Sequence, residues 1–158
     1  MEKQVNRGQD GAGVANIKID VPAGHRYISR YRSVEQNAVA DIFGKIYKKF
    51  RKGLKDHKDK AKDAKWIQEN VAFSGEVFLG HLRYGTQGKN DVNFCHPFIK
   101  SDINPTRNLM MAGNFNLVNT EEILDAVKPN ITTPAGSDLG AMIETIHHFL
   151  CYSKLRIN

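Results

Sequence analysis

Residues 15–21 alternate between apolar and polar side chains. The apolar ones are Ala15, Ile17, Ile19 and Val21. Because successive side chains of a strand point to opposite faces, this alternation predicts a strand with one apolar face. Pro22-Ala23-Gly24 then predicts a turn, and residues 27–32 are expected to return as the second arm of a hairpin.

Apolar residues recur every three or four positions between residues 34 and 50. They are Val34, Ala38, Val39, Ile42, Phe43, Ile46, Tyr47 and Phe50. This spacing predicts an amphipathic helix that packs against a sheet. Ser33-Val34-Glu35-Gln36 has the form of a capping box, so we expect Ser33 to cap this helix.

The second half of the chain continues this mixture of strands and helices. Residues 77–84 predict a buried strand, and residues 109–112 predict another. Asn119 is expected to cap a short helix, and Ser137 is expected to cap the last helix. The inward face of that last helix is expected to carry Leu139, Met142, Ile143, Ile146 and Leu150. Strand pairs mixed with amphipathic helices predict an α+β layered domain.

The length and composition narrow the class of protein. A chain of 158 residues favours one domain with a sizeable core. It contains no run of about 18 apolar residues and no basic, apolar leader, so we expect no membrane span, no membrane partner and a cytoplasmic location. The two cysteines, Cys95 and Cys151, are too few for a disulfide scaffold.

The net charge of +6 comes from one segment. Residues 45–65 hold ten lysines and arginines against three aspartates, a balance of +7, so the rest of the chain sums to −1. We expect a solvated, lysine-rich insertion over residues 45–70. Nucleic-acid binding is the alternative, but it is favoured by aromatic residues interleaved with arginine, and here lysine dominates. We therefore expect no nucleic-acid partner.

Three short blocks carry the candidate chemistry. They are Arg7-Gly8-Gln9-Asp10-Gly11-Ala12-Gly13, Gly80-His81-Leu82-Arg83-Tyr84-Gly85-Thr86 and Gly113-Asn114-Phe115-Asn116-Leu117-Val118-Asn119. The second and third blocks set polar groups at the end of an apolar run, where a sheet can hold them still. Together they offer a fixed cation and amide donors to a small anionic ligand, which predicts a substrate pocket.

In their order and spacing these blocks resemble the glutaminase domain of class II glutamine amidotransferases, most closely the amidophosphoribosyltransferases of purine synthesis. Further segments that fit are His96-Pro97-Phe98, Asn119-Thr120-Glu121-Glu122 and Ser137-Asp138. The resemblance identifies residues 1–158 as a partial glutaminase domain, and it weakens between about residues 45 and 70. It implies the four-layer αββα sandwich of N-terminal-nucleophile hydrolases, truncated at the N-terminus.

The resemblance also implies roles for individual residues. Arg83, assisted by Thr86, matches the arginine that binds the glutamine carboxylate. Asn114 matches the asparagine whose amide donates to the oxyanion, and Asp138 matches the aspartate that receives the substrate ammonium. At Phe115 relatives carry a glycine whose N–H is the second oxyanion donor. Because phenylalanine is costly at positive φ, we expect Phe115 to adopt an ordinary backbone conformation or to be strained.

Three more residues would lie around this pocket by resemblance. Arg7 and Gln9 would lie near the nucleophile, and Tyr84 would follow the anchoring arginine toward the acceptor domain. Two of the assigned residues have simpler explanations: Arg83 could pair with a surface acid. Asp138 would favour the first turn of any helix because of the helix dipole.

The family nucleophile is an amino-terminal cysteine that uses its own α-amine as the general base. No cysteine, serine or threonine precedes Arg7 in this chain. We therefore expect the nucleophile and the first strand to be missing, and this chain to be inactive alone. A missing central strand would leave an unpaired sheet edge, so we also expect this chain either to form a homo-oligomer or to be marginally stable.

The remaining cysteines and histidines do not suggest a substitute nucleophile or a metal site. Cys95 precedes His96, but sequence neighbours on an extended chain point to opposite faces. Cys151 is expected to be a small buried hydrophobe. The pair His147-His148 lacks the partners and spacing of a metal site. We expect no metal and no cofactor in this domain.

The expected activity of the parent protein is release of ammonia from glutamine for transfer to phosphoribosyl pyrophosphate. The phosphoribosyltransferase domain does not appear within the 158 residues. Two alternatives stay open: the glutaminase domain of another class II amidotransferase, in aminosugar or asparagine synthesis, and a non-catalytic amino-acid-binding module.

Overall fold

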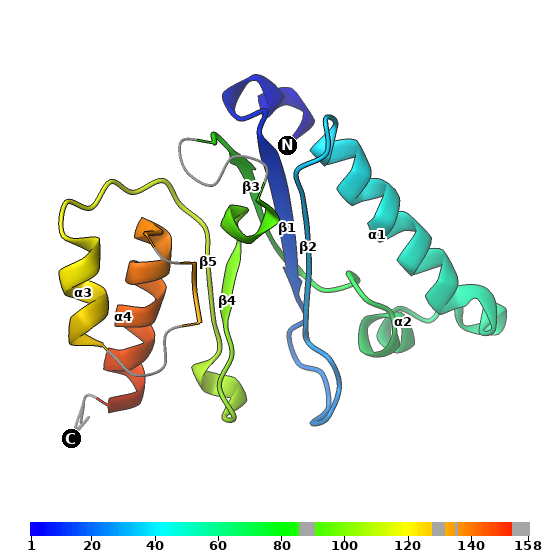
Figure 1. Cartoon of the computed structure of the whole chain (residues 1–158). Helices are drawn as coiled ribbons and strands as arrows, with labels where there is room; N and C mark the ends of the chain where they lie inside the picture. The colour runs from blue at the N-terminus through cyan, green and yellow to red at the C-terminus, as the bar shows by residue number, and fades with distance from the viewer. Residues whose placement is uncertain (86–90, 128–131, 135, 153–158) are drawn as a thin grey trace. The chain divides into compact units, whose positions relative to one another are not determined.

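The computed structural model describes residues 1–85, 91–127, 132–134 and 136–152 (Figure 1). The chain divides into two compact units, Met1–Pro97 and Phe98–Asn158. The described residues form four α-helices, a three-stranded sheet and a two-stranded sheet. This mixture of helices and antiparallel strands agrees with the predicted α+β class.

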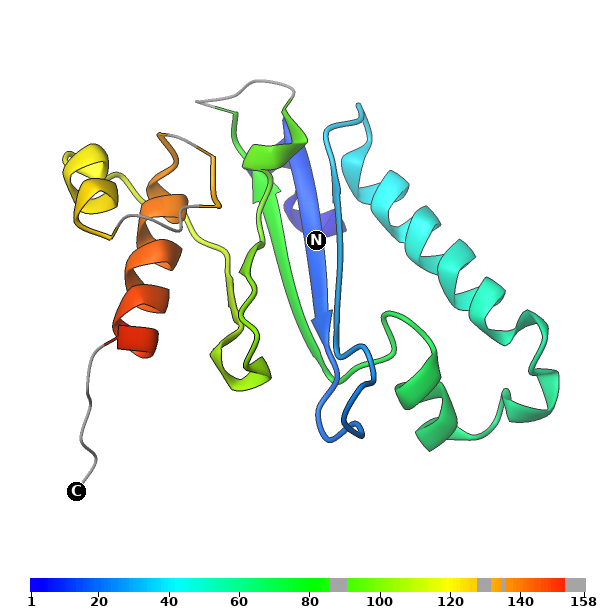
Figure 2. The same ribbon diagram turned by 60° about the horizontal axis from the view of Figure 1, so that its bottom comes forward.

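Unit 1 is built around the three-stranded sheet. Its elements are η1 (Glu2–Arg7), β1 (Gly11–Ile17), β2 (Ile28–Ser33), α1 (Ala38–Lys55), η2 (Lys58–Lys60), α2 (Ala64–Asn70), β3 (Val77–Arg83) and η3 (Val92–Phe94). The strand order is β2-β1-β3, and β1 is antiparallel to both neighbours. Figures 1 and 2 both show α1 running alongside this sheet.

Strand β1 is buried on both of its faces. Ala12 and Val14 pack against the α1 face, whose buried residues are Ala38, Val39 and Ile42. On the other face, Gly13 lies so close to the backbone carbonyl of His96 that a Cβ atom there would overlap it. A strand covered on both sides has no polar face. For this reason β1 does not show the alternation that we used to search for strands.

The sheet corrects the predicted bounds of the first strand. The alternation predicted a strand over residues 15–21, whereas β1 covers Gly11–Ile17 and Ile19 is 54% exposed. The predicted second arm of the hairpin is confirmed, because β2 pairs antiparallel with β1. The predicted third strand is confirmed as β3, but the prediction that it is buried is wrong. Val77, Phe78 and Gly80 are exposed, and Arg83 is the one residue of β3 that is buried.

Helix α1 begins four residues later than the predicted capping box. Asn37 is its N-cap, and the Asn37 side chain accepts a hydrogen bond from the Ala40 N–H at 3.2 Å. Ser33 ends β2 instead, and its hydroxyl donates to Asp41 at 2.6 Å. The predicted apolar stripe is confirmed at its centre, whereas Phe43 and Tyr47, which were expected to widen it, are exposed.

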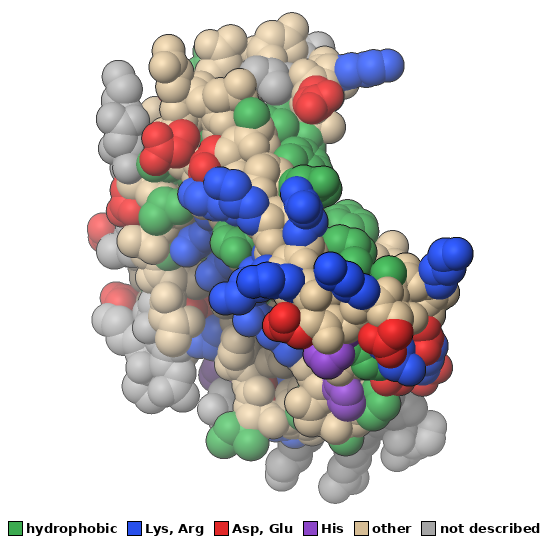
Figure 3. Space-filling view, turned by 90° about the vertical axis from the view of Figure 1, so that its right-hand side faces the viewer, with side chains coloured by type: hydrophobic (Ala, Val, Ile, Leu, Met, Phe, Trp, Pro, Cys, Tyr) green, Lys and Arg blue, Asp and Glu red, His purple; other side chains and the backbone are tan. Residues whose placement is uncertain are grey.

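The lysine-rich segment forms the end of α1, the short helix η2 and the start of α2. All of its lysines and arginines between residues 45 and 65 are exposed except Lys60, which is half-buried. Figure 3 shows blue lysine and arginine side chains spread over this side of the molecule. The prediction that these side chains are solvated is confirmed, and the interpretation of residues 45–70 as an insertion stays a prediction.

Unit 2 consists of a hairpin and two helices. Its elements are β4 (Phe98–Lys100), η4 (Pro105–Arg107), β5 (Leu109–Met111), α3 (Thr120–Ala126) and α4 (Asp138–Tyr152). β4 and β5 are antiparallel, with Ile99 opposite Met110. The core joins Phe98 of the hairpin to Leu139 and Ile143 of α4.

The predictions for unit 2 are mostly confirmed. β5 lies within the predicted residues 109–112. Ser137 caps α4, because its hydroxyl accepts the Gly140 N–H at 3.1 Å. Helix α3 follows Asn119, but the Asn119 side chain makes no capping bond. The predicted inward face of α4 included Leu150, and that prediction is wrong because Leu150 is 48% exposed.

Candidate functional site

Arg83 is a buried cation at the end of β3. The residue is only 4% exposed, and its guanidinium carbon lies 5.8 Å from the centre of the Phe94 ring. A guanidinium over an aromatic face gains cation–π attraction, and it gains more where water is excluded. Arg83 is thus not on the surface, where the simpler interpretation placed it, and its assignment to a ligand stays a prediction.

The first and second sequence blocks lie side by side at this strand end. Gly11 of β1 pairs with Arg83 of β3. The Asp10 N–H donates to the Arg83 carbonyl at 3.2 Å, and the Asp10 carboxylate accepts the Gly85 N–H at 2.8 Å. A Cβ atom on Gly8 would come within 2.8 Å of the Arg83 carbonyl oxygen. The glycine therefore lets the first block pass directly over the strand that carries Arg83.

The other predicted residues of unit 1 lie on the surface or outside the described residues. Gln9 is exposed, and Tyr84 is 72% exposed. The backbone of Arg7 ends η1. Thr86, the expected assistant of Arg83, lies outside the described residues.

Cys95 is a buried thiol close to Arg83. It is fully buried, and its Sγ atom lies 3.7 Å from the Ser33 carbonyl oxygen, to which it donates. Burial raises the pKa of the Cys95 thiol, and the nearby guanidinium groups of Arg83 and Arg32 oppose that shift. A thiol that is neutral and enclosed is a poor nucleophile.

The ring of His96 lies against the ring of His81. The two rings are tilted by 46° and their centres are 4.3 Å apart. Burial lowers the pKa of His81, which favours the neutral imidazole. The two histidine rings thus contact each other, and the expectation that Cys95 and His96 do not form a catalytic pair stays a prediction.

In unit 2, Asn114 and Phe115 lie in the segment after β5, and two residues separate Asn114 from the end of that strand. Asn114 is exposed, and Phe115 is 38% exposed. Among the described residues, positive φ outside glycine occurs at Asp20 and Phe73, so the backbone of Phe115 lies in an ordinary region. Its ring folds back onto Gly113, where a Cβ atom would come within 2.5 Å of the ring. The Phe115 N–H therefore carries no cost from left-handed backbone strain.

Asp138 begins α4 and is half-buried. Its Oδ1 atom accepts a hydrogen bond from the Thr120 hydroxyl at 2.8 Å. Thr120 is the first residue of α3, so this bond ties the starts of the two helices together. A carboxylate has lone pairs for further donors, so the bond to Thr120 leaves capacity for an ammonium group.

The described candidates thus fall into two sets. Gln9, Arg83 and Tyr84 belong to unit 1, where backbone bonds join the Arg83 strand to the first block. Asn114, Phe115 and Asp138 belong to unit 2. Among the candidates whose side chains the structure describes, the charged ones are Arg83 and Asp138, and each lies at an end of its own strand or helix.

Unit 1 also has a basic cleft that we did not predict. Its volume is about 940 Å³, and its lining includes Lys18, Arg26, Lys49, Lys52 and Glu69. Lys18 is buried, and its ammonium donates to the Glu69 carbonyl at 3.1 Å. Burial and the neighbouring Arg26 lower the pKa of Lys18. Arg83 is not part of this lining, so the cleft is separate from the predicted pocket.

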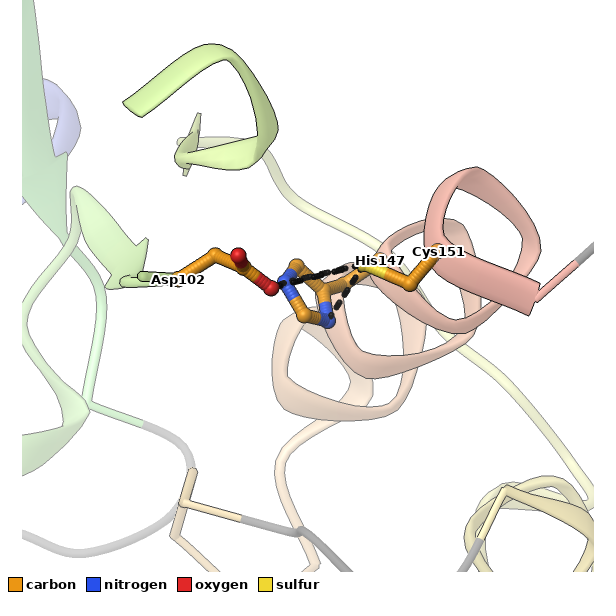
Figure 4. Close-up of side chains that lie close together, drawn as sticks. All are labelled: Asp102, His147 and Cys151. Atoms are coloured by element: carbon orange, nitrogen blue, oxygen red, sulfur yellow. Dashed lines mark hydrogen bonds and ion pairs between the residues drawn. The ribbon is translucent and has the colours of Figure 1, made fainter. Parts of the chain in front are cut away.

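A second feature that we missed lies in unit 2. Asp102, His147 and Cys151 form a cluster in which each offers one ligand atom within 4.8 Å of the others (Figure 4). The interpretation that His147 has no partners for a metal is therefore wrong. Cys151 was expected to be a buried hydrophobe, but it is half-buried among polar groups. The i, i+4 spacing of His147 and Cys151 was the one available signal, because it places both on one helix face.

Comparison of the chain with protein-family models, with curated proteins and with solved structures gives no match. None of the described helices is long and apolar enough to cross a membrane.

Proposed function

We propose that this chain is the glutaminase domain of a cytoplasmic class II glutamine amidotransferase of the amidophosphoribosyltransferase type. In this proposal the two sheets belong to a four-layer αββα sandwich of the N-terminal-nucleophile hydrolase kind. The observation that carries the proposal is the burial of Arg83 at the end of β3, where its backbone carbonyl accepts the N–H of Asp10 from the Arg7–Gly13 block.

Arg83 is proposed to bind the α-carboxylate of glutamine. A planar guanidinium can hold a carboxylate through two parallel hydrogen bonds, and such charge-assisted bonds are about twice as strong as neutral ones. Burial at 4% exposure supports this role, because the attraction between opposite charges grows as water is excluded. Cation–π attraction to the Phe94 ring helps to hold the guanidinium in place.

Asn114 and Phe115 are proposed to stabilise the oxyanion, Asn114 through its side-chain amide and Phe115 through its backbone N–H. Removing one such donor typically costs about 3 kcal/mol of transition-state stabilisation. The ordinary backbone of Phe115 supports its part, because the N–H is available without strain. Asp138 is proposed to accept the substrate ammonium.

The nucleophile in this proposal is an amino-terminal cysteine of the parent protein. Its thiolate attacks the side-chain amide carbon, the oxyanion forms, ammonia leaves with the proton taken up by the α-amine, and water hydrolyses the thioester to glutamate. The released ammonia is passed to phosphoribosyl pyrophosphate on a phosphoribosyltransferase domain. This chain alone is expected to bind glutamine without turning it over, because Cys95 is enclosed.

The burial of the Cys95 thiol also favours the second candidate, a non-catalytic module that binds an amino acid. The two candidates share the pocket and differ in whether an upstream cysteine completes it. Glutaminase domains for aminosugar or asparagine synthesis would use the same pocket with another ammonia acceptor.

The proposal is tested by binding of matched ligands to the chain. L-glutamine should bind, and the analogue that lacks the α-amine should bind more weakly. Asp138→Asn should weaken the binding of L-glutamine. It should not weaken the binding of the amine-free analogue, because that analogue has no ammonium group to contact Asp138. Equal losses of affinity for both ligands would show that Asp138 only holds the starts of the two helices together. Failure of L-glutamine to bind would overturn the proposal.

A further inference from the structure

The cluster of Asp102, His147 and Cys151 has side chains of three different chemistries pointing at one another (Figure 4). Asp102 Oδ2 lies 3.3 Å from His147 Nε2, and Cys151 Sγ lies 3.5 Å from the same nitrogen. Sγ lies 3.6 Å from Asp102 Oδ2. The three ligand atoms therefore form a nearly equilateral triangle.

These three separations match one face of a tetrahedral zinc site. With zinc at about 2.3 Å from sulfur and about 2.1 Å from nitrogen and oxygen, tetrahedral angles place nitrogen and oxygen about 3.4 Å apart. The same geometry places the sulfur about 3.6 Å from each of the other two ligand atoms. The observed distances of 3.3, 3.5 and 3.6 Å agree with these values to about 0.1 Å.

We propose that Asp102, His147 and Cys151 bind a zinc ion through these three atoms, with a fourth coordination position open to water. A thiolate and an imidazole are ligands that favour zinc over magnesium or calcium, which prefer all-oxygen sites. On binding, the thiol loses its proton to solvent and its sulfur joins the zinc. This inference does not depend on the proposed glutaminase function.

The surrounding structure already positions the carboxylate. Asp102 Oδ1 accepts the Asn104 N–H at 2.8 Å, and the Asp102 N–H donates to the Asn108 side chain at 2.6 Å. These bonds fix the turn after β4 and leave Oδ2 directed at His147. Side chains that are held before binding lose less entropy when the ion arrives.

The same geometry argues against a cysteine–histidine–aspartate catalytic triad. In a triad the nucleophile and the carboxylate contact opposite nitrogens of the imidazole, so that one nitrogen takes the proton while the other is anchored. Here Asp102 and Cys151 both approach Nε2. Sγ is also 3.8 Å from Nδ1, so the ring must turn for the Nε2 lone pair to point at the ion.

The charge balance suits a divalent cation. Aspartate and thiolate together supply two negative charges, which neutralise zinc. Arg107 is the nearby cation, acting on both Asp102 and Cys151. Arg107 is exposed, so water can solvate its guanidinium.

The test uses the whole chain, reduced, stripped with a chelator and free of any histidine tag. Zinc is titrated in competition with a chromogenic chelator, and cobalt(II) is then used as a spectroscopic probe. We expect one zinc per chain, and a thiolate-to-cobalt charge-transfer band in the near ultraviolet. Cys151→Ser should abolish that band and weaken zinc binding by about tenfold or more. His147→Ala and Asp102→Asn should also weaken zinc binding.

The controls change the same residue types outside the cluster. His148→Ala alters the adjacent histidine, and Cys95→Ala removes the thiol of unit 1. Both should bind zinc like the unaltered chain. Circular dichroism confirms that each variant is folded, and Asp102→Asn provides a conservative change if Cys151→Ser fails to fold. Absence of stoichiometric zinc, or equal binding by the cluster variants and the controls, would overturn the inference.

Discussion

The ammonium of Lys100 lies 2.8 Å from a carboxylate oxygen of Glu144, and both side chains are buried. Lys100 ends β4 and Glu144 lies within α4, so the ion pair joins the hairpin of unit 2 to its long helix. The second carboxylate oxygen accepts the Thr132 N–H at 2.8 Å. Each charge thus has hydrogen-bonding partners, as a buried ion pair requires.

Lys100→Met is expected to destabilise the protein by about 3 kcal/mol, because it leaves Glu144 buried without its counter-charge. Chemical denaturation followed by circular dichroism measures the loss. The double variant Lys100→Met/Glu144→Leu should recover most of the loss, since apolar residues of similar size replace both charges. A single variant as stable as the unaltered chain would contradict the importance of this pair.

Gly13→Ala should lower the free energy of unfolding of unit 1 several times more than a typical surface substitution does. The new Cβ would overlap the backbone carbonyl of His96, which cannot move aside like a flexible side chain. Gly44→Ala is the matched control, because nothing lies within 4 Å of a Cβ there. In the middle of α1 that change should stabilise the protein by about 1 kcal/mol. Similar unfolding midpoints for the two variants would contradict the close packing of β1.

Asp41 is expected to contribute a pH-dependent part of the stability. Hydrogen bonds from Lys45 and Ser33 hold the pKa of the Asp41 carboxyl below its usual value. A lowered pKa stabilises the folded chain above the unfolded value of about 3.9, and this contribution is lost as the pH falls through the folded pKa.

Asp41→Asn tests this contribution. The variant should be less stable than the unaltered chain by about 0.5 kcal/mol at neutral pH, because an exposed pair of this kind contributes little. Urea unfolding at a series of pH values should show the difference shrinking toward strongly acidic pH. A difference that stays constant with pH would mean that the ionised carboxylate is not its source.

The fold could be predicted where one face of an element meets water. The stripe of α1 and the inward residues Leu139 and Ile143 were readable because the opposite face is polar. Strand β1 was misplaced because it is covered on both faces. It also contains Gly11 and Gly13, and glycine is rare in strands. Lys18 was expected on a polar face, yet it is buried with its ammonium on the Glu69 carbonyl.

The candidate site could be predicted only as far as local sequence reaches. The position of Arg83 at a strand end followed from the apolar run before it, and the structure confirms that position. The cluster of Asp102 with His147 and Cys151 could not be found, because Asp102 comes from a turn far from α4 in the sequence. Its partners depend on how the hairpin packs against the helix, and no local pattern records that packing.

The most direct test of the proposed function is a calorimetric titration of the chain with L-glutamine, comparing Arg83→Lys with Arg51→Lys. Arg51 is an exposed arginine of α1, so its replacement controls for the loss of a guanidinium. We predict that Arg83→Lys weakens binding by about tenfold or more, because lysine cannot form the two parallel bonds, while Arg51→Lys binds like the unaltered chain. Undiminished binding by Arg83→Lys would contradict the assignment of Arg83 to the glutamine carboxylate.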